Sequence, residues 1–268
     1  MWHNLANLVR YRGLIQSLVA RELKARYRGS VLGFFWSFVN PLLLLGVYSF
    51  VFATIMKGDP KDTMSRPEPY AVFMFCGILP WTWFSSSLLE ASSSLISGGN
   101  LIKKVLFPAE VLPIVSVLAN MVHFAFGLSI LAGFMVAKGH VPVLANLAWF
   151  PLIVLVQLIL TLGLALLLSA LTVHFRDLKD LLSNILTLWF FATPIIYSYK
   201  IPAMEPYRNY FKFNPFYHLA IPYQESLFFG GTYGHISSLF ILGGISVLFF
   251  LGAYWLFDRL RDSFAEVV

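Results

Sequence analysis

Six long apolar runs constrain the fold of this chain more than any other feature of its sequence. They cover residues 32–56, 70–95, 111–137, 146–172, 181–199 and 237–257. A helix needs about 20 apolar residues to cross a bilayer, and each run has close to that length or more. One soluble core could not hide so many apolar side chains, because 58% of the residues are hydrophobic and only 12% are charged, against roughly 25% charged in soluble domains. The sequence therefore predicts an all-α, polytopic membrane protein with six transmembrane helices.

The distribution of Lys and Arg predicts the orientation of these spans. Six spans place both termini on the same side of the membrane. With the N-terminus inside, twelve of the 19 Lys and Arg residues are cytoplasmic, and six of those twelve lie in residues 1–31. Basic flanks of this kind mark the cytoplasmic side. We therefore expect a multi-pass protein of the cytoplasmic (inner) membrane with both termini cytoplasmic. Basic loops beside anionic lipid also account for the net charge of +6, so membrane lipids are expected as partners and nucleic acid is not.

The first 31 residues are expected to form an amphipathic helix in the headgroup plane. At 100° per residue, apolar side chains share one broad face of this helix. Four basic side chains share the opposite face: Arg10, Arg21, Lys24 and Arg28. Arg12 and Arg26 break this pattern, because they fall toward the apolar face. An ordinary basic flank is the alternative, and it explains the charges but not their clustering.

The segment 200–236 has the composition of neither a span nor a solvated loop. More than a quarter of its residues are aromatic, and four prolines forbid one continuous helix: Pro202, Pro206, Pro215 and Pro222. We expect short interfacial or re-entrant helices between the fifth and sixth spans, in places where protein or a wet cavity covers the backbone. A plain belt of aromatic residues at the membrane surface is the alternative.

The chain shows no energy source of its own. It has no G-x-x-x-x-G-K-[ST] loop to hold a triphosphate. The "SGGN" at 97–100 resembles the signature motif of ABC-type ATPases, but it lies in a connection too short to form an ATPase domain. Glu90 and His123 are the only Asp, Glu, Lys, Arg or His residues inside the predicted spans. An ion-coupled carrier usually needs more charged groups than this within its spans to bind the coupling ion. His123 is expected to be a satisfied histidine of the bundle.

Signs of catalysis and of a metal site are missing as well. The sequence has no paired carboxylates, no His/Cys cluster with metal-ligand spacing and no serine beside a base on one face. We therefore expect no enzyme activity, no catalytic residue and no metal site. A helical bundle of this kind has to be passive or driven from outside.

Six motifs, in order along the chain, resemble those of the permease subunits of ABC-2-type polysaccharide exporters. They are "RYRGSVLGFFWSFVNPLLLLGVY" (26–48), "GILPWTWFSSSL" (77–88), "NLIKKVLFPAEVLP" (100–113), "HFRDLKDLL" (174–182), "FFATPIIYS" (190–198) and "FNPFYHL" (213–219). The resemblance covers essentially the whole chain.

The resemblance implies one transmembrane domain over residues 1–268. Within it, 1–31 would be a cytoplasmic interface helix, 32–257 the six-span bundle and 258–268 a cytoplasmic tail. It also implies a homodimer bound to two copies of a separate ATPase subunit. That subunit would hold ATP and Mg, so this chain needs no cofactor. The implied substrate is a lipid-linked polysaccharide such as O-antigen, capsular polysaccharide or teichoic acid.

By the same resemblance, residues 100–113 would be the segment through which the ATPase moves the permease, and 174–182 would be a second contact. The expected coupling residues are Lys103, Lys104, Phe107, Pro108, Arg176 and Asp177. The lysines supply charge, while the Phe-Pro pair offers a compact apolar knob for a groove on the ATPase. Two other interpretations stay open: the lysines as an ordinary basic flank, and the Arg-Asp pair as a local helix cap.

Aromatic side chains are the candidates for contact with a glycan. A sugar ring has an apolar C–H face that can rest on an aromatic ring, at about 0.5–1.5 kcal/mol per ring beyond burial. Weak, repeated contacts of this kind suit a moving polymer. The candidates for the substrate path are Trp36, Tyr48, Phe52, Trp81, Trp83, Phe84, Trp189 and Tyr197. Those for an external gate, which the resemblance places in 200–236, are Tyr207, Phe213, Phe216 and Tyr217. Each could instead be a membrane-surface anchor.

Three alternative functions remain. An ABC-2 exporter of drugs or small lipids differs from the main hypothesis only through the family match. A polytopic enzyme acting on lipid-linked sugars would need acidic or His residues clustered at one membrane face, and the sequence shows none. A secondary carrier is disfavoured by the shortage of charge within the spans.

Overall fold

The computed structural model describes residues 10–26, 28–32, 35–50, 67–103, 107–137, 139, 142–197, 202–229 and 234–267. Every regular element in these residues is a helix, which confirms the all-α prediction.

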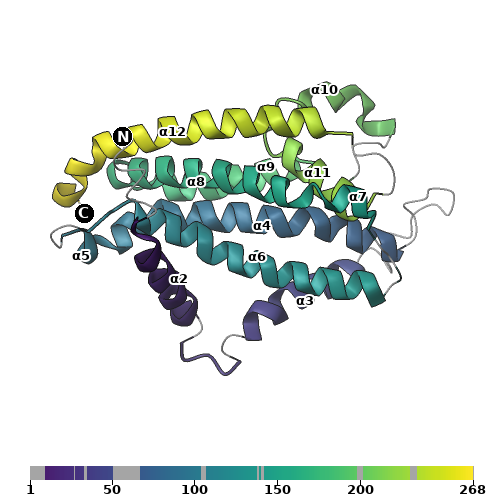
Figure 1. Ribbon diagram of the computed structural model, residues 1–268, viewed down its shortest axis with the longest axis horizontal. Coiled ribbons are helices and arrows are strands. Elements are labelled where there is room, and N and C mark those ends of the chain that lie inside the picture. The colour runs from purple at the N-terminus through teal and green to yellow at the C-terminus, as the bar shows by residue number, and fades with distance from the viewer. Residues whose placement is uncertain are drawn as a thin grey trace.

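Four long helices form the body of the molecule and run side by side along its longest axis (Figure 1). They are α4 (Pro67–Ser97), α6 (Val111–Ala137), α8 (Phe150–His174) and α12 (Ile236–Val267). Helix α4 lies between α6 and α8, and α12 packs along α8. All four were predicted as spans from their apolar runs.

Four stretches of the described chain are long and apolar enough to cross a membrane. They are Ala71–Ser97, Val111–Ala137, Leu144–His174 and Ile236–Arg261. The other two predicted spans correspond to shorter helices, α3 (Trp36–Phe50) and α9 (Leu178–Phe191). A helix of 14 residues such as α9 is about 21 Å long. That is less than the roughly 30 Å of bilayer hydrocarbon.

Helix α9 ends earlier than the apolar run that predicted it. The run continues to residue 199, but the helix stops at Phe191. Pro194 explains the difference, because the residue before a proline avoids the helical region and proline cannot donate a backbone hydrogen bond. For α3, the final residues of the predicted span, 51–56, lie outside the described part of the chain.

Glycine allows the long helices to approach closely. A Cβ atom on Gly163 of α8 would lie 2.9 Å from Cδ1 of Phe249 and 3.1 Å from Cα of Phe250 on α12. On Gly127 of α6, it would lie 2.5 Å from Cδ2 of Leu79 on α4. Helices in membranes associate through such small-residue contacts, since lipid offers no hydrophobic driving force between them.

Short helices fill the segment between α9 and α12, as expected. They are the 3-10 helix η3 (Pro202–Tyr207), α10 (Arg208–Phe211) and α11 (Tyr217–Leu227). Helix α11 is buried along almost its whole length and packs against α4, α8, α12 and the single turn α7 (Leu144–Leu147). A surface belt of aromatic residues would not be covered in this way, so the structure favours the interpretation as short, protein-covered helices.

Buried glutamines support the backbone next to two prolines. Nε2 of Gln157 on α8 donates a hydrogen bond of 2.8 Å to the carbonyl of Pro80, which lies inside α4. Nε2 of Gln224 on α11 donates one of 3.1 Å to the carbonyl of Pro194, just after α9. Both side chains are fully buried. Neighbouring helices thus supply the polar groups that irregular backbone needs at membrane depth.

The two ends of the bundle carry different elements (Figure 1). The α5 end holds the single turn α5 (Gly99–Ile102) and the C-terminal turns of α12; the α11 end holds α7, α10 and α11. A small core of its own lies at the α5 end, formed by Leu95, Ala109, Leu166, Ala170, Val173, Tyr254, Phe257 and Phe264. The predicted C-terminal tail, 258–268, is therefore largely helical, because α12 continues to Val267 and places Phe264 in this core.

Helix α2 (Arg12–Arg26) leans away from the parallel bundle and packs against α6 (Figure 1). A helix thus lies within the N-terminal segment, over Arg12–Arg26, whereas its predicted place in the headgroup plane stays a prediction and residues 1–9 lie outside the described chain. Its apolar Ile15, Val19 and Leu23 are half-covered, whereas the basic side chains assigned to the opposite face are exposed.

Candidate functional site

An aromatic hollow of about 640 Å³ opens at the α11 end. Its lining comes from the end of α9, the turn after it, and the η3–α10 segment: Trp189, Ala192, Tyr197, Tyr207, Tyr210, Phe211, Phe213 and Asn214. Two candidates for the path, Trp189 and Tyr197, thus meet two candidates for the gate, Tyr207 and Phe213. These pairs are separated by up to two dozen residues, and the turn at Pro194 brings them together.

The polar group that organises this hollow is Asn214. Its Oδ1 accepts hydrogen bonds from the indole N–H of Trp189 at 2.7 Å and from the backbone N–H of Phe216 at 3.0 Å. Its Nδ2 donates to Oγ1 of Thr193 at 2.8 Å and to the carbonyl of Ala192 at 3.3 Å. One side chain therefore ties the end of α9 to the turn before α11. Sequence reasoning quoted the motif that contains Asn214 but used only its aromatic residues.

The rim of the hollow is strongly exposed. Tyr207, Tyr210 and Phe213 have exposed fractions of 56%, 72% and 86%. Exposed aromatic side chains gathered in one place form either a binding surface or the aromatic anchors of a membrane protein at the headgroups. Flat exposed rings can stack on the apolar face of a sugar ring, whereas both donors and both lone pairs of the Asn214 amide are used within the chain and hold the lining in place.

The other two gate candidates lie inside the chain. Phe216 is fully buried, with its ring centroid 4.8 Å from that of Trp81. Tyr217 is buried in a small cluster with Phe211 and Ile221, and its ring stacks on Phe211 at 6.0 Å. In this structure both side chains pack inside the protein at the start of α11.

Three candidates for the path are also core residues of the single chain: Trp81, Trp83 and Phe84. Phe84 is fully buried, and its ring lies 5.4 Å from Trp189. Trp83 projects from α4 in another direction, stacks on Phe124 at 5.0 Å, and donates its indole N–H to the carbonyl of Val117 at 3.1 Å. Neither Trp83 nor Phe84 has an exposed face in this chain: Phe84 packs against Trp189 of the hollow, whereas Trp83 packs against α6.

A shallow groove of about 320 Å³, the α3–α9 groove, runs between α3, α4 and α9. It is lined by Leu44, Ile78, Trp81, Thr82, Ser85, Leu89, Ser183, Leu186, Thr187 and Phe190. Hydroxyl groups from α4 and α9 line an otherwise apolar wall. Those of Thr82 and Thr187 donate to carbonyls of their own helices, at 2.8 and 3.0 Å. Their remaining lone pairs can accept hydrogen bonds from a polar ligand. Sequence reasoning missed these hydroxyls because it searched for aromatic residues.

The remaining path candidates belong to the first predicted span. Trp36 begins α3, and its indole N–H donates to Oγ of Ser30 at 2.8 Å. The side chain of Tyr48 and the whole of Phe52 lie outside the described part of the structure.

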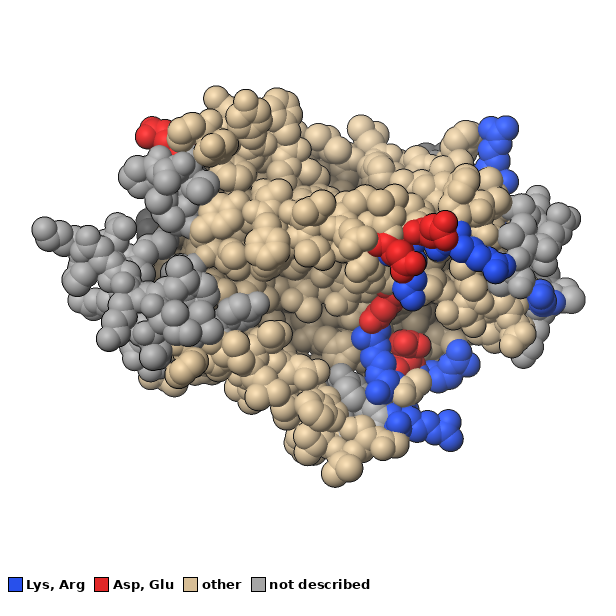
Figure 2. Space-filling model, turned by 180° about the vertical axis from the view of Figure 1, so that it is seen from behind, with Lys and Arg blue, Asp and Glu red and all other residues tan. Residues whose placement is uncertain are grey.

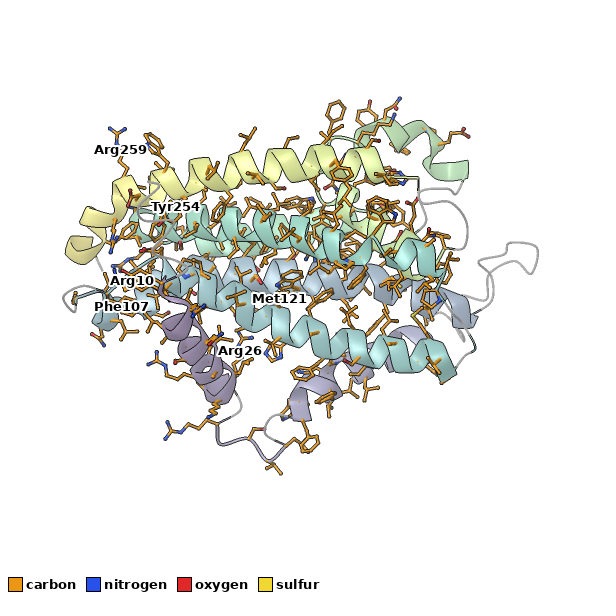
Figure 3. The ribbon with its side chains drawn as sticks, in the orientation of Figure 1. Arg10, Arg26, Phe107, Met121, Tyr254 and Arg259 are labelled. Carbon is orange, nitrogen blue, oxygen red and sulfur yellow. The ribbon has the colours of Figure 1, made fainter. Side chains whose placement is uncertain are left out.

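The predicted coupling residues gather at the α5 end. Lys103 is exposed after α5, and Phe107 is half-exposed at the tip of this end (Figure 3). Pro108 is buried, so it supports the segment from inside, and Lys104 lies outside the described residues. Figure 2 shows that the charged side chains on its face gather toward this same end.

The second predicted coupling contact lies between α8 and α9 at this end. Arg176 and Asp177 are both exposed. Asp177 precedes α9 without a side-chain hydrogen bond to its first turn, so the structure does not support the alternative of a helix cap.

A buried acid of the coupling segment lies near a cation of α12, at a distance too long for a hydrogen bond. Glu110, just before α6, has a side chain that is 4% exposed, and its Oε2 lies 3.8 Å from Nη1 of Arg261 on α12. A carboxylate at a helix N-terminus is also stabilised by the helix dipole. Sequence reasoning missed this pair, which joins residues that lie far apart in the sequence. Among the residues that the structure describes, no group of three or more His, Cys, Asp or Glu could hold a metal ion.

Comparison with known proteins identifies the family. Residues 13–228 match the model of the ABC-2 type transporter family. The chain is 40% identical over 262 residues to the O-antigen export system permease protein RfbA of Myxococcus xanthus, with 97% of each chain covered. It is 34% identical over 258 residues to the protein of the same name from Klebsiella pneumoniae, with 95% of each covered. This chain therefore belongs to the ABC-2 type transporter family.

Proposed function

We propose that this chain is the permease subunit of an ATP-driven exporter, which moves lipid-linked polysaccharide of the O-antigen kind across the cytoplasmic membrane. Full-length similarity to permeases named for O-antigen export supports the transport role. The observation that carries the substrate class is the aromatic hollow, whose exposed rings surround the hydrogen-bonded Asn214. The chain itself performs no hydrolysis.

In this proposal α3 and α9 complete a six-span bundle in the inner membrane. The α5 end and both termini face the cytoplasm, and the α11 end faces outward. Helix α2 lies along the headgroups, with its exposed Arg21 and Lys24, and the flanking Arg10 and Arg28, toward anionic lipid.

A second copy of this chain completes the path. Helices α3 and α9 expose several large apolar side chains: Leu42, Leu43, Val47 and Phe50 on α3, and Leu181, Leu188 and Phe191 on α9. In a homodimer these faces and the two α3–α9 grooves would meet. The glycan would pass between them, along Trp81 and the groove hydroxyls, toward the aromatic hollow. Trp36, Tyr48 and Phe52 of the first span would line the same route, backed by the buried Trp83 and Phe84.

Two copies of a separate ATPase subunit, carrying ATP and Mg, would drive the dimer from the α5 end. Lys103, Lys104 and Phe107 would contact the ATPase, with Pro108 holding the segment in shape. Arg176 and Asp177 would form the second contact. Tyr207 and Phe213, supported by Phe216 and Tyr217, would close the outer end at rest.

The test is reconstitution of the chain with its ATPase in vesicles that contain a fluorescent lipid-linked glycan. ATP should move the glycan to the leaflet where an added glycosidase can reach it. Export of the glycan without the ATPase, or no export with it, would contradict the proposal.

The apolar lining of the hollow favours one second candidate, an exporter of drugs or small lipids. The same vesicles separate the two. A planar dye that is exported while the glycan stays in place would support this candidate instead.

A further inference from the structure

The last residue of α2 reaches into the bundle. Helix α2 buries none of its residues completely, and it packs against α6 from outside. Arg26 shares its half-covered face with Ile15, Val19 and Leu23. Figure 3 places Arg26 at the end of α2, beside α6. Of the two arginines that break the amphipathic pattern, Arg12 is exposed and Arg26 lies on the face that meets the long helices.

Arg26 connects three helices. Its Nη2 donates to Oε2 of Glu90 on α4 in an ion pair, and its Nη1 donates to Oδ1 of Asn120 on α6 at 3.1 Å. Nδ2 of Asn120 also donates to the same Glu90 oxygen at 2.6 Å, and to the carbonyl of Ser116 at 2.9 Å. We call Arg26, Glu90 and Asn120 the Arg26 clasp.

Each member of the clasp orients the other two. The Asn120 amide accepts from the cation and donates to the anion, so it contacts both charged groups at once. Glu22, one turn earlier on α2, adds a weaker contact, with Oε1 at 3.7 Å from Nε of Arg26. The two opposite charges of an ion pair largely compensate each other, whereas a single charge left without its partner in a partly covered site lowers the free energy of unfolding.

The clasp is only partly covered. The side chains of Arg26 and Glu90 are 21% and 39% exposed. Ion pairs at exposed sites contribute little to folding stability. Replacing such a pair by apolar residues can even be neutral, so the pair is better explained by what it positions than by stability alone.

A tight turn follows the clasp directly. Gly29 has a φ of +80°, a backbone conformation that glycine adopts without strain. The chain then enters α3, whose Trp36 is hydrogen-bonded to Ser30. The turn gives α2 a pivot at its C-terminal end, and the clasp lies one turn of helix before that pivot.

We propose that Arg26, Glu90 and Asn120 are positioning residues that transmit movement of α2 to α4 and α6. With the clasp formed, a push on α2 displaces the long helices. With the clasp broken, α2 rotates about the Gly29 turn and the push is lost. This inference rests on the proposed function and extends it, because it makes α2 a third element on which the separate ATPase acts.

The experiment compares Arg26→Gln and Glu90→Gln with the charge-swapped pair Arg26→Glu/Glu90→Arg. Arg21→Gln is the matched control, since Arg21 is exposed on the same helix. The position of α2 is read by the spin-label distance between Lys24→Cys on α2 and Ser129→Cys on α6, both exposed sites. The native Cys76 is buried. Coupling is read as glycan exported per ATP hydrolysed by the complete complex.

Both single variants should broaden the distance distribution and lower export per ATP about fivefold, the lower end of typical coupling between sites. The swapped pair should recover a narrow distribution and at least part of the export, and Arg21→Gln should match the unaltered protein. The swapped pair also keeps the test valid if a single variant fails to reach the membrane.

Two results would overturn the inference: a distribution that stays narrow in both single variants, or one that broadens while export per ATP is unchanged. Failure of the proposed function looks different. In that case the unaltered complex shows no ATP-dependent export, and the distance measurement alone decides whether the clasp holds α2.

Discussion

The two ends of the bundle are held together by different chemistry. At and near the α5 end, charged pairs join elements that are distant in sequence: Glu110 with Arg261, and Arg26 with Glu90. At the α11 end, aromatic rings pack around the amide of Asn214, and the acid–base contact there, Oε1 of Glu225 with Nδ1 of His235 at 2.8 Å, joins residues only ten positions apart. Charged pairs fix direction and register between helices, whereas aromatic packing supplies apolar area of low conformational cost. The difference fits an end that follows a partner's motion and an end that contacts a substrate.

The largest expected effect is at the α11 end. Asn214→Ala removes the acceptor of the Trp189 indole and of the Phe216 backbone N–H, which should lower the free energy of unfolding by about 2 kcal/mol. Thermal unfolding in detergent should show a Tm lower by about 4–8 °C. Asn209→Ala is the control, since Asn209 is an exposed asparagine of the same segment. Equal Tm values for both variants would remove the organising role of Asn214.

The next prediction tests whether the exposed residues at the α5 end serve coupling to the ATPase rather than stability of the fold. Phe107→Ala and Lys103→Glu should each leave the Tm almost unchanged but lower export per ATP about tenfold, which corresponds to about 1.4 kcal/mol of lost coupling. The reason is that Phe107 is only half-covered and Lys103 is exposed, so neither stabilises the fold strongly. ATP hydrolysis and glycan export are measured on the same vesicles. Normal export in both variants would contradict the coupling role of the segment.

A smaller effect is expected for the pair of Glu110 and Arg261. Arg261→Gln leaves the buried carboxylate of Glu110 without its cation, and should lower the free energy of unfolding by about 1 kcal/mol. The double variant Glu110→Gln/Arg261→Gln should lose no more than the single one. Unfolding by denaturant measures both. A clearly additive loss in the double variant would show that the two residues act separately.

The smallest effect belongs to the rim of the aromatic hollow. Phe213→Ala should leave the Tm within about 1 °C, because the side chain is 86% exposed and surface changes rarely matter to stability. Export of the glycan should fall about threefold, since one stacking contact is lost. Lys212→Ala, an exposed neighbour, is the control. A large fall in Tm instead would mean that the rim is structural, and the contrast between the two ends would weaken.

The long helices could be predicted from the sequence because lipid imposes one requirement, a long apolar run, and the order of residues meets it directly. The end of α9 could not be predicted, because Pro194 favours a break in the helix whereas the apolar residues around it favour a continuous span. Packing decides between the two. Burial was equally hard to foresee. Trp83 and Phe84 are adjacent and similar, yet one packs on Phe124 and the other on Trp189.

The polar connections illustrate a second limit. Arg26 could be recognised as an exception to the amphipathic pattern of its own helix. Its partners could not be identified, because they lie 64 and 94 residues further along the chain. For Asn214 the motif was visible, but the hydrogen bond to Trp189 depends on the turn between them. Local pattern therefore marks such residues as unusual, and only the fold reveals what they bind.

The burial of α11 also bears on how the chain is made. Helix α11 carries Gln224, Glu225 and Ser226 in its interior-facing turns, and these cannot rest in lipid without protein around them. One of the helices that cover it, α12, is synthesised after it. Most of its cover comes from α4, α8 and α7, which are synthesised before it, but Glu225 accepts a hydrogen bond from the backbone N–H of Gly234 and pairs with Nδ1 of His235, directly before α12. A nascent chain that stopped short of Gly234 would therefore leave this buried acid without these two partners.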